Sequence, residues 1–340
     1  MTRLWRRVLI IGVLLLGAAG AALFLAWQDM NRSLDTPLAL TQPELYDIRP
    51  GSSIAKIAGD FATKGWLNHA LYLRVEATQA GLAARIQAGT YELKPGDTPR
   101  ALLRRFAVGD VKTYAVTFVE GASFADIMAQ VSTLPGVEAE LRHASPADVM
   151  RALGAATEPP EGWLFPSTYY YHHRTTDREL LSRAYRQMRE VLQRHWEARA
   201  KDLPYKTAYE ALIMASIIEK ETGRADERGA IAGVFVRRLQ KGMRLQTDPT
   251  VIYGLGSQFD GNLRKVDLQR DTPYNTYQRD GLPPTPICSP GEQAIMAALN
   301  PAPGDALYFV ARGDGSHVFS ATLDAHNAAV RDYQKQGRER

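Results

Sequence analysis

The feature that most constrains this chain of 340 residues is an uncharged apolar run near its N-terminus. Residues 8–26 contain no charged side chain and consist mainly of Leu, Ile, Val, Ala and Gly. At a rise of about 1.5 Å per residue, a helix of this length can cross a hydrocarbon core about 30 Å thick. A cleaved signal peptide is the alternative, but the run continues through Leu23 to Leu25, beyond the usual apolar region of such a peptide. We therefore predict a single membrane-spanning helix over residues 8–27.

The charges around this helix predict its orientation. Arg3, Arg6 and Arg7 precede the apolar run and supply three of the four net positive charges of the chain. The positive-inside rule then assigns residues 1–7 to the cytoplasm and the remaining chain to the other side of the membrane. That remaining part is close to neutral, so its charge indicates no nucleic-acid binding. The single cysteine, Cys288, excludes a disulfide within the chain and a multi-cysteine metal site.

The part that follows the predicted helix begins with a polar stretch and a recurring local pattern. Residues 28–43 are polar and contain two prolines, which predicts a flexible tether. Three later segments each combine a strand end, a glycine turn, a polar cap and an amphipathic helix, with the caps at Ser53, Thr98 and Ser123. Chance similarity of glycine turns before helices is the alternative. The pattern favours small α/β units.

The second half of the chain is predicted to be mainly helical, with a terminal hairpin. Thr176 to Glu179 form a capping box that starts a helix, and further helices are expected near residues 207–223 and 229–241. Two apolar segments flank the turn 313–316, which indicates a β-hairpin, and a last helix is expected over residues 324–335. The fold class is therefore α+β.

Glu219 is the main candidate for chemistry. In a helix over residues 207–223 it would share a face with small and apolar residues, namely Ala208, Leu212, Ala215, Ser216 and Thr222. An unpaired carboxyl in such surroundings is desolvated when ionised, so we expect its pKa to be raised. A carboxylic acid of raised pKa suits general acid catalysis near neutral pH. The alternative is an ordinary solvated glutamate on the helix surface.

Three other ionisable residues near these elements are assigned less specific roles. Glu221 lies about 200° from Glu219 around the helix, and its favoured interpretation is a salt bridge with Arg224 or Arg228. It would enter a cleft if the helix frayed before its end. His317 and His326, in the hairpin and the last helix, are interpreted as structural or surface residues.

Six segments together carry a resemblance to a known family. They are residues 161–166 (EGWLFP), 215–222 (ASIIEKET), 245–250 (LQTDPT), 272–277 (TPYNTY), 281–287 (GLPPTPI) and 313–319 (GDGSHVF). In this order they resemble the MltG/YceG-like endolytic murein transglycosylases, over essentially the whole chain. The resemblance implies a LysM-like subdomain over residues 44–112 and a catalytic domain over residues 113–340. It also implies a single-pass protein of the inner membrane whose catalytic domain is periplasmic.

The resemblance also implies a reaction and a site. The family's catalytic glutamate corresponds to Glu219, acting first as general acid and then as base. It would cleave the MurNAc–GlcNAc bond of nascent peptidoglycan strands without water and leave 1,6-anhydro-MurNAc ends. No cofactor or metal is expected, and peptidoglycan synthases are expected partners. Polar and aromatic residues of the shared segments are the candidates for substrate binding: Gln246, Asp248, Tyr274, Asn275 and Tyr277.

Two other functions remain open at this stage. One is a peptidoglycan-binding anchor without catalytic activity, built on the LysM-like part. The other is a glycan hydrolase in which a second carboxyl, Glu221 or Asp248, activates water and leaves a reducing end. For Asp248 a turn or cap before Pro249 is also open, for Tyr274 and Tyr277 core packing, and for Asn275 the support of a loop through backbone hydrogen bonds.

Overall fold

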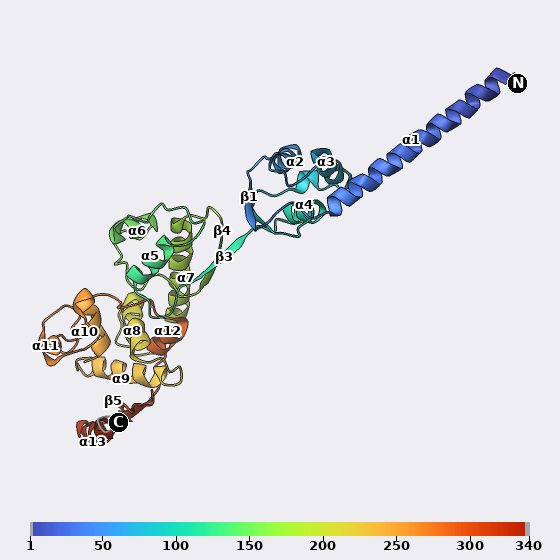
Figure 1. The fold of residues 1–340 in the computed structure, drawn as a ribbon. Coiled ribbons are helices and arrows are strands. Elements are labelled where there is room, and N and C mark those ends of the chain that lie inside the picture. Colours follow the sequence, from blue (N-terminus) through green and yellow to red (C-terminus); the bar gives the residue numbers. More distant parts are fainter. Residues whose placement is uncertain (1–2, 337–340) are drawn as a thin grey trace. The chain divides into compact units, whose positions relative to one another are not determined.

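The protein divides into two compact units, with the division between Tyr114 and Ala115. The computed structural model describes residues 3–336, and Figure 1 shows their helices and strands. The sequence placed the domain boundary between residues 112 and 113. The predicted α+β class, with an apolar N-terminal helix and a C-terminal hairpin followed by a helix, is confirmed.

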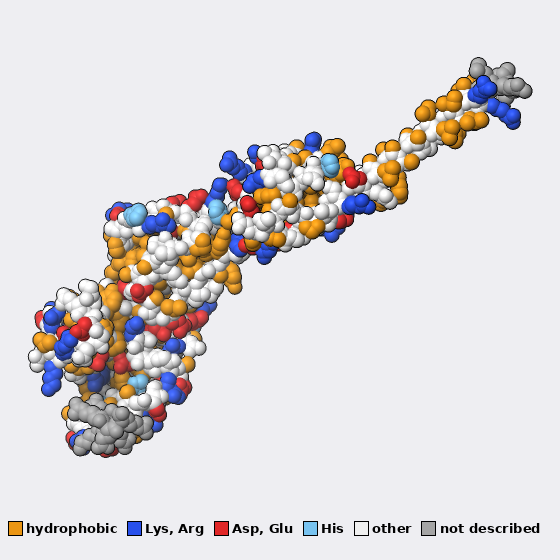
Figure 2. All heavy atoms as spheres, viewed as in Figure 1, with side chains coloured by type: hydrophobic (Ala, Val, Ile, Leu, Met, Phe, Trp, Pro, Cys, Tyr) orange, Lys and Arg blue, Asp and Glu red, His pale blue; other side chains and the backbone are white. Residues whose placement is uncertain are grey.

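The N-terminal helix is longer than the apolar run that predicted it. Helix α1 spans Arg3–Asp35, and among the residues that the structure describes it is the one helix long and apolar enough to cross a membrane. Its large apolar side chains are exposed from Val8 to Trp27. Figure 2 shows hydrophobic side chains along the helix and basic side chains near its N-terminal end.

The prediction of a flexible tether over residues 28–43 is wrong. Residues 28–35 continue α1, and Met30, Leu34 and Leu38 are buried in the core of the first unit. Met30 and Leu34 stand four residues apart, so they share one helix face that packs on this core. Arg100 reinforces the connection by donating to Asp35 Oδ2 at 2.7 Å and to Asn31 Oδ1 at 2.6 Å. The end of α1 is therefore fixed to the first unit.

The rest of the first unit is a two-stranded sheet with three α-helices and one short 3₁₀ helix. Strand β1 (Glu44–Ile48) pairs antiparallel with β2 (Gly89–Leu93). Helices α2 (Ile54–Thr63) and α3 (Ala70–Gln79) and the short helix η1 (Ala83–Arg85) lie between the strands in sequence, and α4 (Pro99–Val108) follows them. The predicted caps are confirmed, because Ser53 and Thr98 accept the backbone N–H of the third helical residue. The LysM-like character of this part stays a prediction.

The second unit is mainly helical. Strand β3 (Thr113–Thr117) pairs with β4 (Thr168–His172), and β5 (Tyr308–Ala311) forms a hairpin with β6 (His317–Ser320). The helices before β5 are α5 (Phe124–Ser132), α6 (Pro146–Ala152), α7 (Asp177–Glu197), α8 (Ala208–Glu221), α9 (Arg228–Gln240), α10 (Asp248–Leu255), η2 (Gly256–Gln258), α11 (Lys265–Gln269) and α12 (Glu292–Leu299). Helix α13 (Leu323–Gln336) follows the hairpin. Ser123 and Thr176 form capping boxes at the starts of α5 and α7.

Helix α8 lies at the centre of this unit. Every residue from Ala211 to Ile218 is buried, and α7, α9, α10 and α12 pack around the helix. In Figure 1 α8 and α12 lie side by side, and the hairpin and α13 lie next to α9. Because these helices surround α8, the residues at its C-terminal end contact segments from distant parts of the chain, such as Gly291 and Thr247.

Candidate active site

Helix α8 places two carboxyl groups near its C-terminal end, Glu219 and Glu221. The helix begins after the N-cap Thr207, whose hydroxyl accepts the backbone N–H of Glu210, and its C-cap is Thr222. Both ends lie within two residues of the prediction. The two carboxyls point to different surroundings because two residues turn a helix by about 200°.

Glu219 is enclosed and paired. Its side chain is only 6% exposed, Arg228 Nη2 donates to its Oε1 at 3.1 Å, and the backbone N–H of Gly291 donates to its Oε2 at 2.9 Å. Burial raises the pKa of Glu219, as expected, although the Gly291 hydrogen bond and the charge of Arg228 oppose that rise. The expectation of an unpaired carboxyl is wrong, since α9 and the start of α12 supply its partners.

Glu221, in contrast, lines a cavity of about 480 Å³. Thr247 donates its hydroxyl to Glu221 Oε2 at 2.6 Å. Burial raises the pKa of Glu221, the Thr247 hydrogen bond opposes this, and the charge of Asp248 adds to it. The favoured salt bridge with Arg224 or Arg228 is wrong, because Arg224 pairs with Asp226 and Arg228 pairs with Glu219.

Three of the five predicted substrate-binding residues line the same cavity: Gln246, Asp248 and Tyr277. The Tyr277 hydroxyl donates to Asp248 Oδ1 at 2.6 Å. Gln246 has a φ of 54°, in the left-handed region that non-glycine residues rarely adopt. Its backbone N–H donates to Thr276 O at 3.2 Å, which links the two segments that carry these side chains. Amide, carboxylate and phenol groups are thus gathered around Glu221.

The other two predicted residues are not among those that line this cavity. Asn275 is fully buried, and its amide donates to three backbone carbonyls, those of Asp267, Leu268 and Arg270, at 2.7–3.2 Å. The Tyr274 hydroxyl lies 2.8 Å from Thr285 Oγ1, and its ring packs edge-on against Tyr253. Asn275 therefore supports a loop, which was its alternative interpretation, and Tyr274 packs against a second aromatic ring.

The cavity contains residues that the sequence analysis did not assign to it. Arg238, Tyr308, His317 and His326 all line it, whereas the sequence analysis interpreted the two histidines only as structural or surface residues. Arg238 is buried and donates to backbone carbonyls, including Leu307 O at 2.7 Å and Leu245 O at 2.9 Å. The hairpin itself was predicted, but only the family resemblance over residues 313–319 connected it with a site, because periodicity says nothing about contacts between distant elements.

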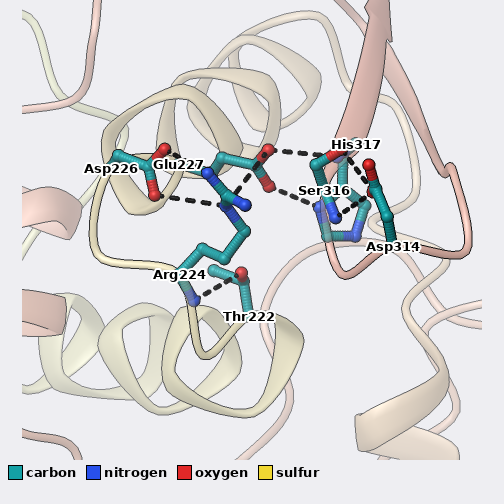
Figure 3. Close-up of polar contacts among 7 residues, drawn as sticks. All are labelled: Thr222, Arg224, Asp226, Glu227, Asp314, Ser316 and His317. Carbon is teal, nitrogen blue, oxygen red and sulfur yellow. Dashed lines mark hydrogen bonds and ion pairs between the residues drawn. The ribbon is translucent and has the colours of Figure 1, made fainter.

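His317 is held by a carboxylate of its own. Glu227 accepts the backbone N–H of His317 at 3.0 Å, and its other oxygen lies 2.7 Å from His317 Nδ1. Figure 3 shows this pair joining the hairpin to the segment before α9, with Arg224 on the far side of Glu227. The contact ties the hairpin wall of the cavity to the loop that follows Glu221.

A larger hollow, about 640 Å³, lies along β4 and α7. Tyr170, Arg178, Arg183 and Arg186 are among the residues that line it, and neither glutamate of the α8 terminus is among them. It lacks a buried carboxyl with a raised pKa, so we place the candidate site at the Glu221 cavity.

Comparison with known proteins agrees with the resemblance. The model of the YceG-like family matches residues 46–332. The chain belongs to this family. It is 32% identical over 304 residues to an endolytic murein transglycosylase of Bacillus subtilis strain 168, and the match covers 84% of each chain. An endolytic murein transglycosylase of Streptococcus pneumoniae serotype 2 strain D39 is 27% identical over 321 residues, covering 84% of this chain and 57% of that relative.

A solved structure is also similar to this chain. The crystal structure of a putative YceG-like protein from Listeria monocytogenes is 28% identical, with a TM-score of 0.49, and the match covers 85% of this chain and 99% of that one.

Proposed function

We propose that this YceG-like protein is a lytic transglycosylase that cuts peptidoglycan strands internally, at the MurNAc–GlcNAc bond. The names of its relatives support an activity on murein. One observation carries the proposal furthest: a buried carboxyl, Glu221, faces a cavity of about 480 Å³ together with Gln246, Asp248 and Tyr277. Such side chains can hydrogen-bond the N-acetyl and hydroxyl groups of a glycan and stack on its rings.

We assign the general acid to Glu221 rather than to Glu219, where the sequence analysis placed it. An acid must reach the substrate, and Glu221 lines the cavity, whereas Glu219 is not among the residues that line it and is bonded to Arg228 and Gly291. An acid must also hold its proton near neutral pH, and burial raises the pKa of Glu221 in that direction. Glu219 then has a structural role, joining α8 to α9 and α12.

The reaction uses one carboxyl twice. Glu221 first donates its proton to the glycosidic oxygen, and the bond from C1 of the muramic ring to that oxygen breaks. The N-acetyl group of the same ring stabilises the charge that develops at C1. The Glu221 carboxylate then accepts the proton of the C6 hydroxyl while that oxygen bonds to C1, which forms the 1,6-anhydro end. The Glu221 side chain is protonated again at the end, and no water is consumed.

Hydrolysis is the second candidate, because Asp248 lines the same cavity as Glu221. Two carboxyls that flank a glycosidic bond can activate a water and leave a reducing end. Asp248 Oδ1 accepts the hydroxyl of Tyr277, which leaves its other oxygen for such a role. The ends of the products distinguish the two reactions.

The location of the protein is part of the proposal. Helix α1 would hold the chain in the cytoplasmic membrane, with the N-terminus in the cytoplasm and the second unit in the periplasm. The first unit would bind glycan as a LysM-like subdomain. Partnership with peptidoglycan synthases is expected from the same location, since their products are the substrate.

The test compares two isosteric variants in the full-length protein in detergent. Wild type, Glu221→Gln and Glu219→Gln are incubated with uncrosslinked glycan strands and with intact peptidoglycan, and mass spectrometry identifies the product ends. Glu197→Gln, an exposed carboxyl of α7 that accepts a hydrogen bond from Gln193, is the control for removal of a glutamate.

We expect 1,6-anhydro ends from wild type and a loss of about 100-fold or more in Glu221→Gln, the usual contribution of a general acid. Glu219→Gln should keep its activity per folded molecule. The reverse result, with Glu219→Gln inactive but folded and Glu221→Gln active, would return the acid to Glu219. Reducing ends from wild type would establish a hydrolase, and glycan bound but uncut by every variant would favour a binding anchor.

A further inference from the structure

The cavity that Glu221 lines contains a further ionisable group, His317, which is oriented by a residue outside the cavity lining. His317 begins β6 and is one of the residues that line the cavity with Glu221. Glu227, the residue before α9, accepts both its backbone N–H and its Nδ1–H, at 3.0 and 2.7 Å (Figure 3). A single carboxylate thus fixes the strand and the ring together.

The surroundings of this pair make it more than a surface salt bridge. The side chains of His317 and Glu227 are 12% and 13% exposed. Burial raises the pKa of Glu227, but the hydrogen bonds from His317 outweigh it and hold that pKa below the ordinary value, so Glu227 is a carboxylate. With Nδ1 bonded to Glu227, the nitrogen left for proton exchange is Nε2. Phe309 packs edge-on against the ring at 5.4 Å between centroids and limits its rotation.

We propose that His317, oriented by Glu227, is the electrostatic partner of Glu221: as an imidazolium it stabilises the Glu221 carboxylate that forms when the proton leaves. The proposal rests on the proposed function, and it deepens the role of that site. His317 exchanges no proton in the step, because the proton passes from Glu221 to the glycosidic oxygen and returns from the C6 hydroxyl. Glu227 is then a positioning residue that acts through the ring.

The other charged groups around the cavity support this choice. Asp248, at the start of α10, raises the pKa of Glu221 and so opposes its ionisation. Arg238 of α9 donates to the carbonyls of Leu245 and Leu307, which fixes its guanidinium in the wall. Burial lowers the pKa of His326 of α13, so this second histidine is neutral near pH 7.

Two phenols complete the ionisable lining. Burial and the hydrogen bond to Asp248 raise the pKa of Tyr277, so it stays neutral, and Tyr308 of β5 stacks beneath the Arg238 guanidinium at 5.1 Å. Of these described groups, His317 is the one that lines the cavity of Glu221 and has a carboxylate partner of its own. The charge of His317 also favours the ionised form of Glu221.

The first test needs no activity. Full-length protein with ¹³C-labelled histidine is titrated by NMR in detergent, and the His317 signal is assigned from its loss in His317→Gln. Coupling between two groups is reciprocal, so Glu221→Gln should lower the His317 midpoint by about half a pH unit or more. Glu219→Gln, which removes a carboxyl of the same helix outside the cavity lining, should shift it less. Equal midpoints in wild type and Glu221→Gln would overturn the proposal whatever the reaction is.

The second test uses the pH dependence of strand cleavage. Without the imidazolium, Glu221 should keep its proton to higher pH, so the upper limb of the rate profile should move up by about half a unit or more in His317→Gln. Glu227→Gln should move it in the same direction by less, because the ring remains. If His317 and Glu227 served only to hold the hairpin in place, their substitution would lower the amount of folded enzyme without moving the upper limb of the rate profile.

A matched control is available in the same unit. His195 of α7 lies 2.7 Å from Glu292 of α12, a histidine–glutamate pair of the same kind that is not part of the cavity lining. His195→Gln should leave the pH profile where it is in wild type. A wild-type profile in His317→Gln would refute the proposal while leaving the proposed function standing, because that function requires only Glu221.

Discussion

Removal of Arg228 should leave Glu219 as an unpaired charge inside the second unit. The two side chains are 9% and 6% exposed, and Arg228 also donates to Gln293 Oε1 at 3.0 Å. Arg228→Met keeps the length and the apolar stem of the side chain but removes the guanidinium. The change therefore tests the ion pair with little change in packing volume.

The expected cost follows from the burial of the pair. Truncating one partner of a buried ion pair costs about 3–5 kcal/mol, because the other charge stays buried without compensation. Gly291 still donates to Glu219, so we expect the lower end, about 3 kcal/mol. That is a large part of the roughly 5–15 kcal/mol that stabilises a typical domain. For a unit of this size it corresponds to a fall in Tm of about 6–12 °C.

The loss of stability in Arg228→Met should depend on pH. Burial raises the pKa of Glu219, and Arg228 opposes that rise, so in Arg228→Met the folded-state pKa lies further above the ordinary value of 4.5. A group with a raised folded-state pKa lowers stability as the pH rises from its unfolded-state pKa to its folded-state pKa, because over that range the unfolded chain releases the proton more readily than the fold. Below pH 4.5 the effect of this group is absent, and it grows as the pH rises through the folded-state pKa. The variant should lose less stability at pH 5 than at pH 8.

The assay is urea unfolding of the full-length protein in detergent at these two pH values. A short deuterium pulse, read by mass spectrometry on peptides from α8, reports unfolding of the second unit alone. The double variant Glu219→Gln with Arg228→Met completes a mutant cycle and should recover part of the loss, since an amide needs no countercharge. A loss below about 1 kcal/mol, or an equal loss at both pH values, would refute the assignment of a buried, energetically coupled pair.

Two further substitutions test the surroundings of the cavity. Asn275→Ala removes an amide that donates to three backbone carbonyls and accepts the Tyr277 N–H, so urea unfolding should show a loss of about 2 kcal/mol; a loss under about 1 kcal/mol would contradict the loop-supporting role. Thr247→Val removes the hydroxyl that donates to Glu221, so the pKa of Glu221 should rise and cleavage should persist to higher pH. An unchanged upper limb of the rate profile in Thr247→Val would show that Glu221 does not govern that limb.

The sequence was sufficient for elements that local signals define. Ser53, Thr98, Ser123 and Thr176 each cap the helix that they were expected to cap, because a capping bond spans only three residues. Local signals failed to predict structure where a segment packs against residues far away in the sequence. The stretch 28–43 has a polar composition typical of a tether, yet Leu34 and Leu38 are buried against residues that follow them in the chain.

The same limit explains the partial success at the site. Gln246, Asp248 and Tyr277 were selected by residue type and by family resemblance, and they share a cavity because Gln246 and Thr276 are joined through their backbones. His317 was not selected, since its position depends on Glu227, ninety residues earlier. Helical periodicity correctly turned Glu219 and Glu221 to different sides. It could not tell which side opens to a cavity, because that depends on how segments far apart in sequence pack around α8.

The two carboxyls illustrate how one helix end can separate two functions. Glu219 reaches the N-terminal end of α12, where a backbone N–H and the charge of Arg228 favour its ionised form against burial. Glu221 is the last residue of α8, where the partial negative charge of a helix C-terminus disfavours a carboxylate. The charge of Asp248 also raises the pKa of Glu221, and the Thr247 hydrogen bond and the charge of His317 limit that rise. Burial raises the pKa of both carboxyls, and Glu221 is the one that faces the cavity, which is why we assign the general acid to Glu221.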